Sequence, residues 1–177
     1  MAPKPQSPVS LAVVDHTAFI RVPGRANFTS SVEFKTAVQE LRQRGLDHFV
    51  VDLSECVTMD STFLGVLAGM AIRLIEQKGL EPEIDLELLN PNQRVADLLE
   101  NLGVVHLFKI SQDAKRCPEC YTPASKGGEA PSKLEISKTC LEAHETLMEV
   151  NPDNVPKFKD VAQFLAEDVR RISSANP

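Results

Sequence analysis

Three consecutive polar residues, Asp60, Ser61 and Thr62, precede an apolar sequence with helical spacing. The apolar run 49–53 and a polar turn come directly before them, which predicts a strand that leads into the start of a helix. The free backbone N–H groups and the positive dipole end of such a helix favour negative charge. Two hydroxyls there are well placed to carry or bind a phosphate. The alternative is that Asp60 caps the helix and the hydroxyls only satisfy backbone groups.

A second candidate is the pair Cys117 and Cys120, which has the spacing of half a zinc site or of a thiol redox motif. Conceivable further ligands are Cys140, His106 and His144. The pair opens a Pro/Gly-rich segment, whereas a redox motif is expected where a strand meets a helix. We therefore predict no metal or other cofactor, and keep zinc binding or redox sensing at Cys117 and Cys120 as weaker alternatives.

The histidines do not favour catalysis by a serine and a base. No local motif ties any of them to Ser61. Cys140 and His144 lie four residues apart on a predicted helix, which is a metal-capable spacing, but we interpret them as residues at the edge of a helical core. The chain is predicted not to be an enzyme.

Composition limits the classes of protein that fit. The 177 residues are 42% hydrophobic and 25% charged, as in a soluble globular protein. A net charge of −6 without a basic cluster argues against nucleic acid as a partner, and no segment is apolar enough for membrane insertion. Residues 1–8 have no apolar signal core, so we predict a disordered lead-in, a cytoplasmic location and reduced thiols.

Hydrophobic periodicity predicts the elements that must position these candidates. Alternating and apolar runs predict strands at 9–14 and 17–22, joined by Asp15 and His16, and strands at 49–53, 84–88 and within 104–110. The strand at 84–88 has one polar face and is placed near a sheet edge. Spacings of three and four predict helices at 31–44, capped by Ser30 and Glu33, at 61–78, ended by Gly79, and from Asn90 and Pro91 to Gly103.

This order predicts an α/β domain in which a mixed sheet of about four or five strands is layered with helices. The expected organisation is a lead-in at 1–8, the α/β domain at 9–112, a linker at 113–132 and a C-terminal helical hairpin at 133–174. Apolar residues recur at helical spacing on two faces of that hairpin. We expect it to pack on the α/β domain and to bury Phe158, Phe164 and Leu165.

The sequence MDSTFLGVL at 59–67, with VVDLS at 50–54 before it and LNPNQRV at 89–95 after it, resembles the STAS domain of bacterial anti-sigma factor antagonists. The resemblance runs from about residue 9 to 110. It implies a STAS fold, partner switching in transcription regulation, and phosphorylation at Ser61, with Thr62 as second choice. The implied partners are an anti-sigma factor that is a serine kinase of the GHKL type and a PP2C-type phosphatase.

The resemblance also implies a partner-binding surface around the start of the second helix. Its predicted members are Asp60, Ser61, Thr62, Phe63, Asn27 and Asn90. The chain departs from the family pattern at Phe63, where kinase substrates commonly carry glycine, and at Asn27, where they commonly carry an acid. The alternative function is a STAS docking subunit of an ABC-type transport complex that is not phosphorylated.

Overall fold

The computed structural model describes residues 8–77, 86–125 and 129–175. Its strands are β1 (Ser10–Val14), β2 (Thr17–Arg21), β3 (Gly24–Ala26), β4 (His48–Asp52), β5 (Cys56–Met59), β6 (Leu86–Leu89), β7 (Lys109–Ser111) and β8 (Thr122–Pro123). Its α-helices are α1 (Phe28–Gln43), α2 (Ser61–Gln77), α3 (Gln93–Asn101), α4 (Lys133–Val150) and α5 (Val155–Ala175). Within these residues no helix is both long and apolar enough to cross a membrane.

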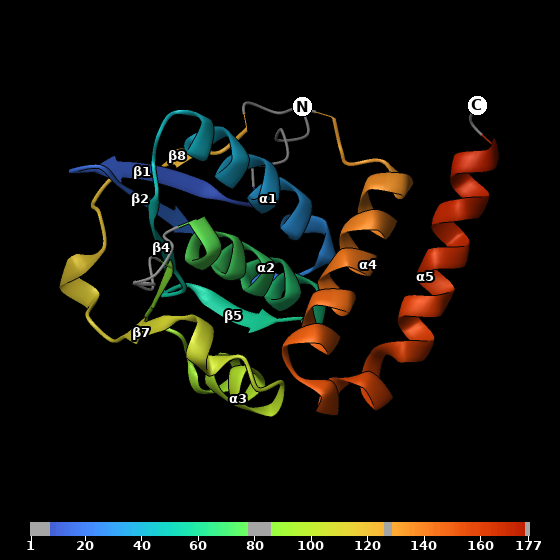
Figure 1. Ribbon diagram of the computed structural model, residues 1–177. Helices are drawn as coiled ribbons and strands as arrows, with labels where there is room; N and C mark the ends of the chain where they lie inside the picture. Colours follow the sequence, from blue (N-terminus) through green and yellow to red (C-terminus); the bar gives the residue numbers. More distant parts are fainter. Residues whose placement is uncertain (1–7, 78–85, 126–128, 176–177) are drawn as a thin grey trace.

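The predicted α/β architecture with a mixed sheet is confirmed. Among the described residues, six strands form one sheet in the order β7-β6-β4-β2-β1-β8, antiparallel at β1 and parallel from β2 to β7. β3 and β5 pair separately, in parallel. Helices α1 and α2 lie side by side over the sheet, α4 crosses close to both of them, and α5 packs on the outer side of α4 (Figure 1).

The β1–β2 turn follows the sequence prediction. Val14 pairs with Thr17, which leaves Asp15 and His16 as a two-residue loop. Both loop residues have positive φ, 47° and 66°, as a turn that matches the twist of a hairpin requires.

Helix α1 begins earlier than the predicted 31–44. Its N-cap is Asn27, whose side chain accepts from the N–H groups of Thr29 and Ser30, while the Ser30 hydroxyl accepts from the Asn27 N–H. The predicted cap with Glu33 is therefore wrong. The earlier cap prevails because β3 ends at Ala26, immediately before Asn27.

The segment before Asp60, predicted to be a polar turn, contains the strand β5. Helix α3 is capped by Asn92, and the prediction of Asn90 as its cap is wrong. The Asn92 side chain accepts from the Val95 N–H and donates to the Cys56 and Val57 carbonyls, so it joins α3 to β5. The predicted strand within 104–110 is a 3₁₀ turn followed by β7. The predictions for Gly79 and for residues 84 and 85 concern positions outside the described residues.

The described part of 84–88, β6, lies next to the edge strand β7, near the edge as predicted, but its polar residue does not face solvent. β6 lies between β4 and β7, and its polar residue Glu87 is buried. Arg116 and Ser111 hydrogen-bond to the Glu87 carboxylate. Burial alone would raise the pKa of Glu87, but these hydrogen bonds outweigh it and the pKa is lowered. A paired carboxylate can therefore occupy an interior strand.

The expected linker contributes structure to the sheet. Its strand β8 pairs with β1, and its Tyr121 hydroxyl donates to Asp52 Oδ2 at 2.8 Å. Arg21 Nε donates to the same oxygen at 2.9 Å, and the Arg21 guanidinium lies 4.1 Å from the centre of the Tyr121 ring. This cluster covers the sheet face opposite α1 and α2, where Phe19 and Val50 are buried.

Replacing Tyr121 by Phe tests how much the hydrogen bond from Tyr121 to Asp52 stabilises the fold. Burial alone would raise the pKa of Asp52, but hydrogen bonds from Ser54, then Tyr121 and Arg21, outweigh it and lower that pKa. Losing the Tyr121 bond to this buried carboxylate should cost about 1.5–3 kcal/mol of unfolding free energy at pH 7. Urea titration should show the loss, whereas Glu119→Gln, at an exposed position in the same segment, should be near neutral.

The stability difference between wild type and Tyr121→Phe should depend on pH. Asp52 has a folded pKa below its unfolded value, so its contribution is complete above about pH 4 and is lost as pH falls through the folded pKa. The stability difference between wild type and Tyr121→Phe should therefore shrink only at acid pH. A difference that grew as the pH fell would contradict the assignment.

Candidate functional site

The start of α2 is built around the Asp60 carboxylate. Its Oδ1 accepts from the Phe63 N–H at 2.8 Å, which caps α2, and its Oδ2 accepts from the Phe28 N–H at 2.9 Å, in the first turn of α1. The Asp60 N–H donates to the Ala26 carbonyl at 2.9 Å, which extends the β3–β5 pairing to the helix. One carboxylate therefore holds two helix starts together, and the sequence expectation that Asp60 caps α2 is confirmed.

Ser61 is the first residue of α2, half-buried, and its hydroxyl contacts α4. Ser61 Oγ lies 3.0 Å from Nε2 of His144, whose Nδ1 lies 2.6 Å from the Cys140 carbonyl oxygen. A carbonyl oxygen only accepts, so Nδ1 carries the proton. In the neutral imidazole Nε2 is then an acceptor, and the Ser61 hydroxyl donates to it.

His144 is enclosed by the C-terminal helices. It is buried, and its ring centre lies 4.9 Å from that of Phe158 on α5. Sequence reasoning found no motif that ties a histidine to Ser61, because 83 residues separate the two. The available signal was that Cys140, His144 and Leu147 share one helix face, which indicates a contact but does not identify its partner.

Thr62 and Phe63 are buried. The Thr62 hydroxyl donates to Cys140 Sγ at 3.6 Å, and Phe63 packs against Phe34 in the core, with ring centres 5.1 Å apart. The prediction that Phe63 lies on a partner-binding surface is therefore not met: its side chain has no exposed area. Its neighbour across the Asp60 bridge, Phe28, is 46% exposed.

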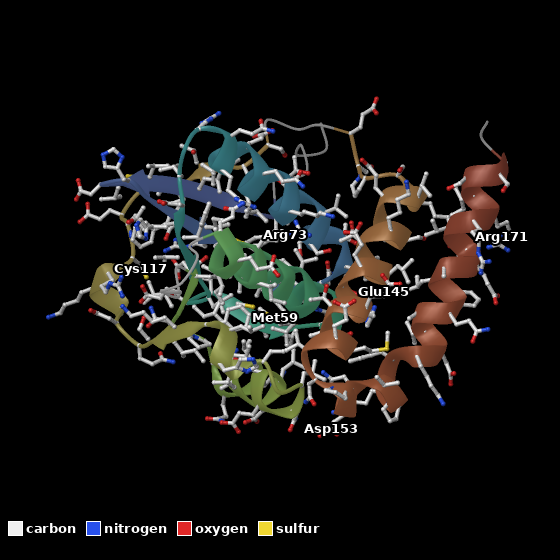
Figure 2. All side chains as sticks on the ribbon, in the orientation of Figure 1. Met59, Arg73, Cys117, Glu145, Asp153 and Arg171 are labelled. Carbon is white, nitrogen blue, oxygen red and sulfur yellow. The ribbon has the colours of Figure 1, made fainter. Side chains whose placement is uncertain are left out.

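Asn27 lies near Ser61 and Asn90 does not. Asn27 caps α1, one residue before the Phe28 amide that binds Asp60. Asn90, with φ of 56°, hydrogen-bonds to Ser54 and Asp113 and approaches Cys117. Figure 2 shows Cys117 on the side of the molecule away from α4 and α5, so the predicted partner-binding residues do not form one patch.

The C-terminal hairpin packs on the α/β domain through α4. A Cβ added to Gly65 would lie 2.4 Å from the Ala143 carbonyl oxygen, so the backbones of α2 and α4 are in close contact. Leu147 is fully buried in the main core, and the Asn154 side chain donates to the Leu102 and Leu147 carbonyls, both at 2.9 Å.

The side chains expected to be buried by the hairpin behave differently from one another. Phe158 is partly buried against the main core, and Leu165 is partly buried. The prediction for Phe164 is wrong, because that side chain is 66% exposed. The difference arises because α5 packs on α4 and not on the sheet, so its outer face has no cover among the described residues.

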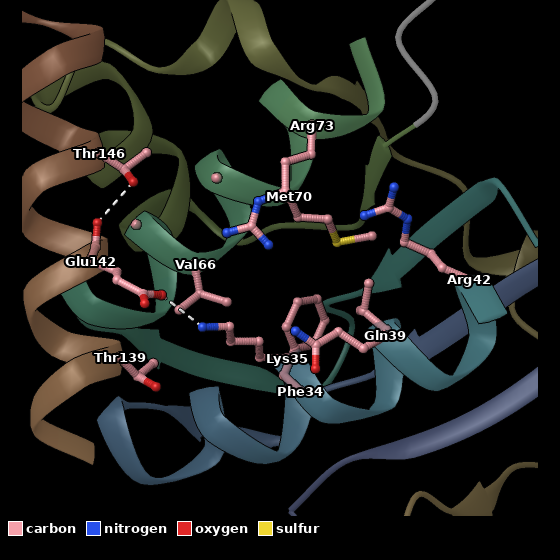
Figure 3. A pocket seen from close by; sticks show the side chains of 13 residues that line it. Phe34, Lys35, Gln39, Arg42, Val66, Met70, Arg73, Thr139, Glu142 and Thr146 are labelled. Atoms are coloured by element: carbon pink, nitrogen blue, oxygen red, sulfur yellow. Dashed lines mark hydrogen bonds and ion pairs between the residues drawn. The ribbon is translucent and has the colours of Figure 1, made fainter. Parts of the chain in front are cut away.

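A groove runs beside the contact between α2 and α4 (Figure 3). It is lined by residues of α1, α2 and α4: Phe34, Lys35, Val38, Gln39, Arg42, Gly65, Val66, Gly69, Met70, Arg73, Thr139, Glu142 and Thr146. Lys35 Nζ and Glu142 Oε2 form an ion pair of 2.7 Å across it. Arg42, which is half-buried, and Arg73, which is exposed, also line it.

The cysteine sites receive no support from geometry. Cys117 and Cys120 are free thiols, and Cys117 Sγ lies 3.4 Å from Ser54 Oγ. Within the residues that the structure describes, no group of three or more His, Cys, Asp or Glu side chains is arranged to hold a metal ion. Cys140 and His144 instead face the hydroxyls of Thr62 and Ser61.

Comparison with known proteins identifies the domain. The family model described as STAS domain matches residues 8–116, more than half of the chain. The chain belongs to the STAS domain family. A search of curated proteins gives no significant match.

Solved structures share the fold of this STAS domain. The protein TM1081 of Thermotoga maritima has 22% identity and a TM-score of 0.51, over 59% of this chain and 85% of that one. The anti-sigma factor antagonist SpoIIAA in its unphosphorylated form has 17% identity and a TM-score of 0.50, over 60% of this chain and 90% of that one. At these identities the likeness concerns the fold.

The Asp60 bridge can be tested by stability. Asp60→Ala leaves the Phe28 and Phe63 N–H groups without their acceptor, so unfolding free energy should fall by about 2 kcal/mol or more. Chemical denaturation followed by circular dichroism measures the change. Asp160→Ala removes an exposed carboxylate from α5 and serves as the control, with little expected change. Equal stabilities of the two variants would contradict the bridge.

Proposed function

We propose that this protein is a signalling protein of the anti-sigma factor antagonist type, which docks a regulatory kinase through the start of α2 and is switched by phosphorylation at Ser61. The observation that carries the proposal is Ser61 itself. It is the first residue of a capped helix in a domain of the STAS family, and the residue is half-buried rather than fully buried. Structural likeness to anti-sigma factor antagonists supports the same general kind of protein.

Burial favours Ser61 over Thr62 as the acceptor. The Thr62 side chain is 5% exposed and its hydroxyl is directed at Cys140, inside the α2–α4 contact. Ser61 is half-buried, and its neighbour Asp60 is fixed by two hydrogen bonds. We infer that Asp60 shapes the docking surface and that the exposed ring of Phe28 replaces Phe63 in it.

The chemistry of the switch is ordinary phosphoryl transfer. Ser61 Oγ forms a bond to the γ-phosphorus of ATP held by the kinase, the bond from that phosphorus to the β–γ bridging oxygen breaks, and ADP leaves with the electron pair. The hydroxyl proton passes to a base of the kinase. A PP2C-type phosphatase would reverse the modification by hydrolysis. The phosphate adds about −1.5 to −2 charges beside Asp60, which repels an acidic or apolar partner surface.

One observation favours the second candidate function. Ser61 already donates its hydroxyl to a buried histidine of its own chain, so its exposed part is limited. A STAS subunit that docks a transport ATPase without phosphorylation would need no free hydroxyl at this position.

Phosphate mapping distinguishes the two functions. Full-length protein recovered from its own cells, in growth and under stress, should contain one phosphoryl group on the peptide that carries Ser61, and Ser61→Ala should remove it. Thr29→Ala, which removes an exposed hydroxyl in the first turn of α1, should leave the phosphate in place. Unmodified Ser61 in every condition would overturn the switch.

Partner capture completes this test. Wild type should retain a serine kinase, and Ser61→Asp should release it. Retention of a transport ATPase by both proteins would favour the alternative.

A further inference from the structure

We propose that the C-terminal hairpin of α4 and α5 is an intramolecular occupant of the docking face, so that a partner or a kinase reaches Ser61 only when α4 separates from the start of α2. This inference rests on the proposed function, because it concerns the regulation of the same site. It assigns a role to the part of the chain beyond residue 116, where the STAS family match ends.

The hairpin lies on the residues that a partner would have to contact. In the first two turns of α2, Ser61 contacts His144, Thr62 contacts Cys140, and Gly65 lies directly under Ala143. Figure 1 shows α4 crossing this end of α2, with α5 on the outer side of α4. A kinase that approached Ser61 from this side would meet α4 and α5 first.

A phosphate on Ser61 does not fit the docked arrangement. Ser61 Oγ is 3.0 Å from His144 Nε2, and esterification removes the proton that the hydroxyl donates there. Nδ1 of His144 donates to the Cys140 carbonyl and Nε2 faces Ser61 Oγ, so the ring occupies the space on this side of the hydroxyl that a phosphoryl group would need. His144 is 6% exposed and stands against Phe158, so its ring has little room to move while α4 stays in place.

The contact between α4 and the α/β domain is polar near Ser61 and apolar and buried at Leu147, so the first part should separate more easily than the second. Near Ser61 the attachments are polar: the two hydroxyl contacts and the exposed ion pair of Lys35 with Glu142. One turn after His144 in α4, Leu147 is fully buried, and so is Asn154 in the 3₁₀ turn that follows α4, where it bonds to the Leu102 carbonyl. We infer that α4 separates from Ser61 at Cys140 and His144 while the segment from Leu147 to Asn154 remains attached.

A matched pair of glycine substitutions tests the inference. Gly65→Ala adds a Cβ 2.4 Å from the Ala143 backbone oxygen, which forces α4 away from α2. Gly69→Ala makes the same change one turn later, where the nearest atom, of Thr146, would be 3.8 Å away. Both remove a glycine from the same helix, so their effects on helix propensity are equal.

Cys140 reports on the opening and Cys56 reports on folding. Cys140 lies within the α2–α4 contact, whereas Cys56 is buried in the main core. Full-length proteins would be pulsed with N-ethylmaleimide, and each cysteine read by peptide mass spectrometry. Gly65→Ala should label Cys140 about tenfold faster than wild type or Gly69→Ala, while Cys56 stays protected. Equal Cys140 labelling in the two glycine variants overturns the proposal.

Charge reversal provides a second variant if Gly65→Ala also exposes Cys56 and so has lost its fold. Lys35→Glu sets a carboxylate against Glu142 and should speed Cys140 labelling several-fold. The double variant with Glu142→Lys restores opposite charges and should restore the wild-type rate. Faster labelling that the double variant does not reverse overturns the proposal.

Phosphate occupancy separates this inference from the proposed function. In its own cells, Gly65→Ala should carry more phosphate on Ser61 than Gly69→Ala does. Equal occupancy, with Cys140 exposed only in Gly65→Ala, overturns masking and leaves the phosphorylation switch intact. If Ser61 is never phosphorylated, the switch fails, and the labelling comparison alone decides whether the hairpin opens.

Discussion

The two oxygens of the Asp60 carboxylate determine where the candidate site lies. Each accepts one backbone N–H, from Phe63 and from Phe28, so the starts of α2 and α1 are fixed relative to each other. A capping carboxylate also complements the positive ends of both helix dipoles. Ser61 follows Asp60 directly, and its position is therefore set by the same group. Asp60 acts on the site through geometry, whether or not a partner ever touches it.

Helix geometry explains why neighbouring residues at this start have such different surroundings. Successive residues are about 100° apart around the helix, so Ser61, Thr62 and Gly65 lie on one side while Phe63 is on the other. The first side meets α4 and the second meets the core at Phe34. Phe63 is thus no obstacle at the surface. The residue that must be small here is Gly65, because the Ala143 backbone occupies the space of its side chain.

The features that the sequence predicts well are those encoded within a few residues. The Asp15–His16 turn, the strand predicted at 49–53 and found at His48–Asp52, and the start of α2 at Ser61 each follow from local spacing and capping. The start of α1 was missed because Asn27 and Ser30 both suit an N-cap, and only the end of β3 decides between them.

Features that depend on distant residues could not be predicted. In the sequence, Glu87 indicates a solvent-exposed strand face. In the structure its carboxylate is paired with Arg116, 29 residues later, and this contact cannot be read from local spacing. The Ser61–His144 bond joins the family domain to an extension outside the family pattern. Periodicity showed that α4 has an apolar face, but not that this face would pack on α2 at Gly65.

The energetics of the hairpin contact limit how Ser61 can regulate it. A hydrogen bond such as Ser61–His144 contributes about 0.5–1.5 kcal/mol net, which changes an equilibrium by about tenfold at most. Reversing a population from 1:99 to 99:1 takes about 5.5 kcal/mol, so loss of the hydroxyl alone cannot empty the docking face. A phosphate also adds a bulky group where the buried His144 ring already lies 3.0 Å from Ser61 Oγ, and it places a dianion beside Asp60. The modification thus acts far more strongly on this contact than any substitution that only deletes the hydroxyl, as a switch requires.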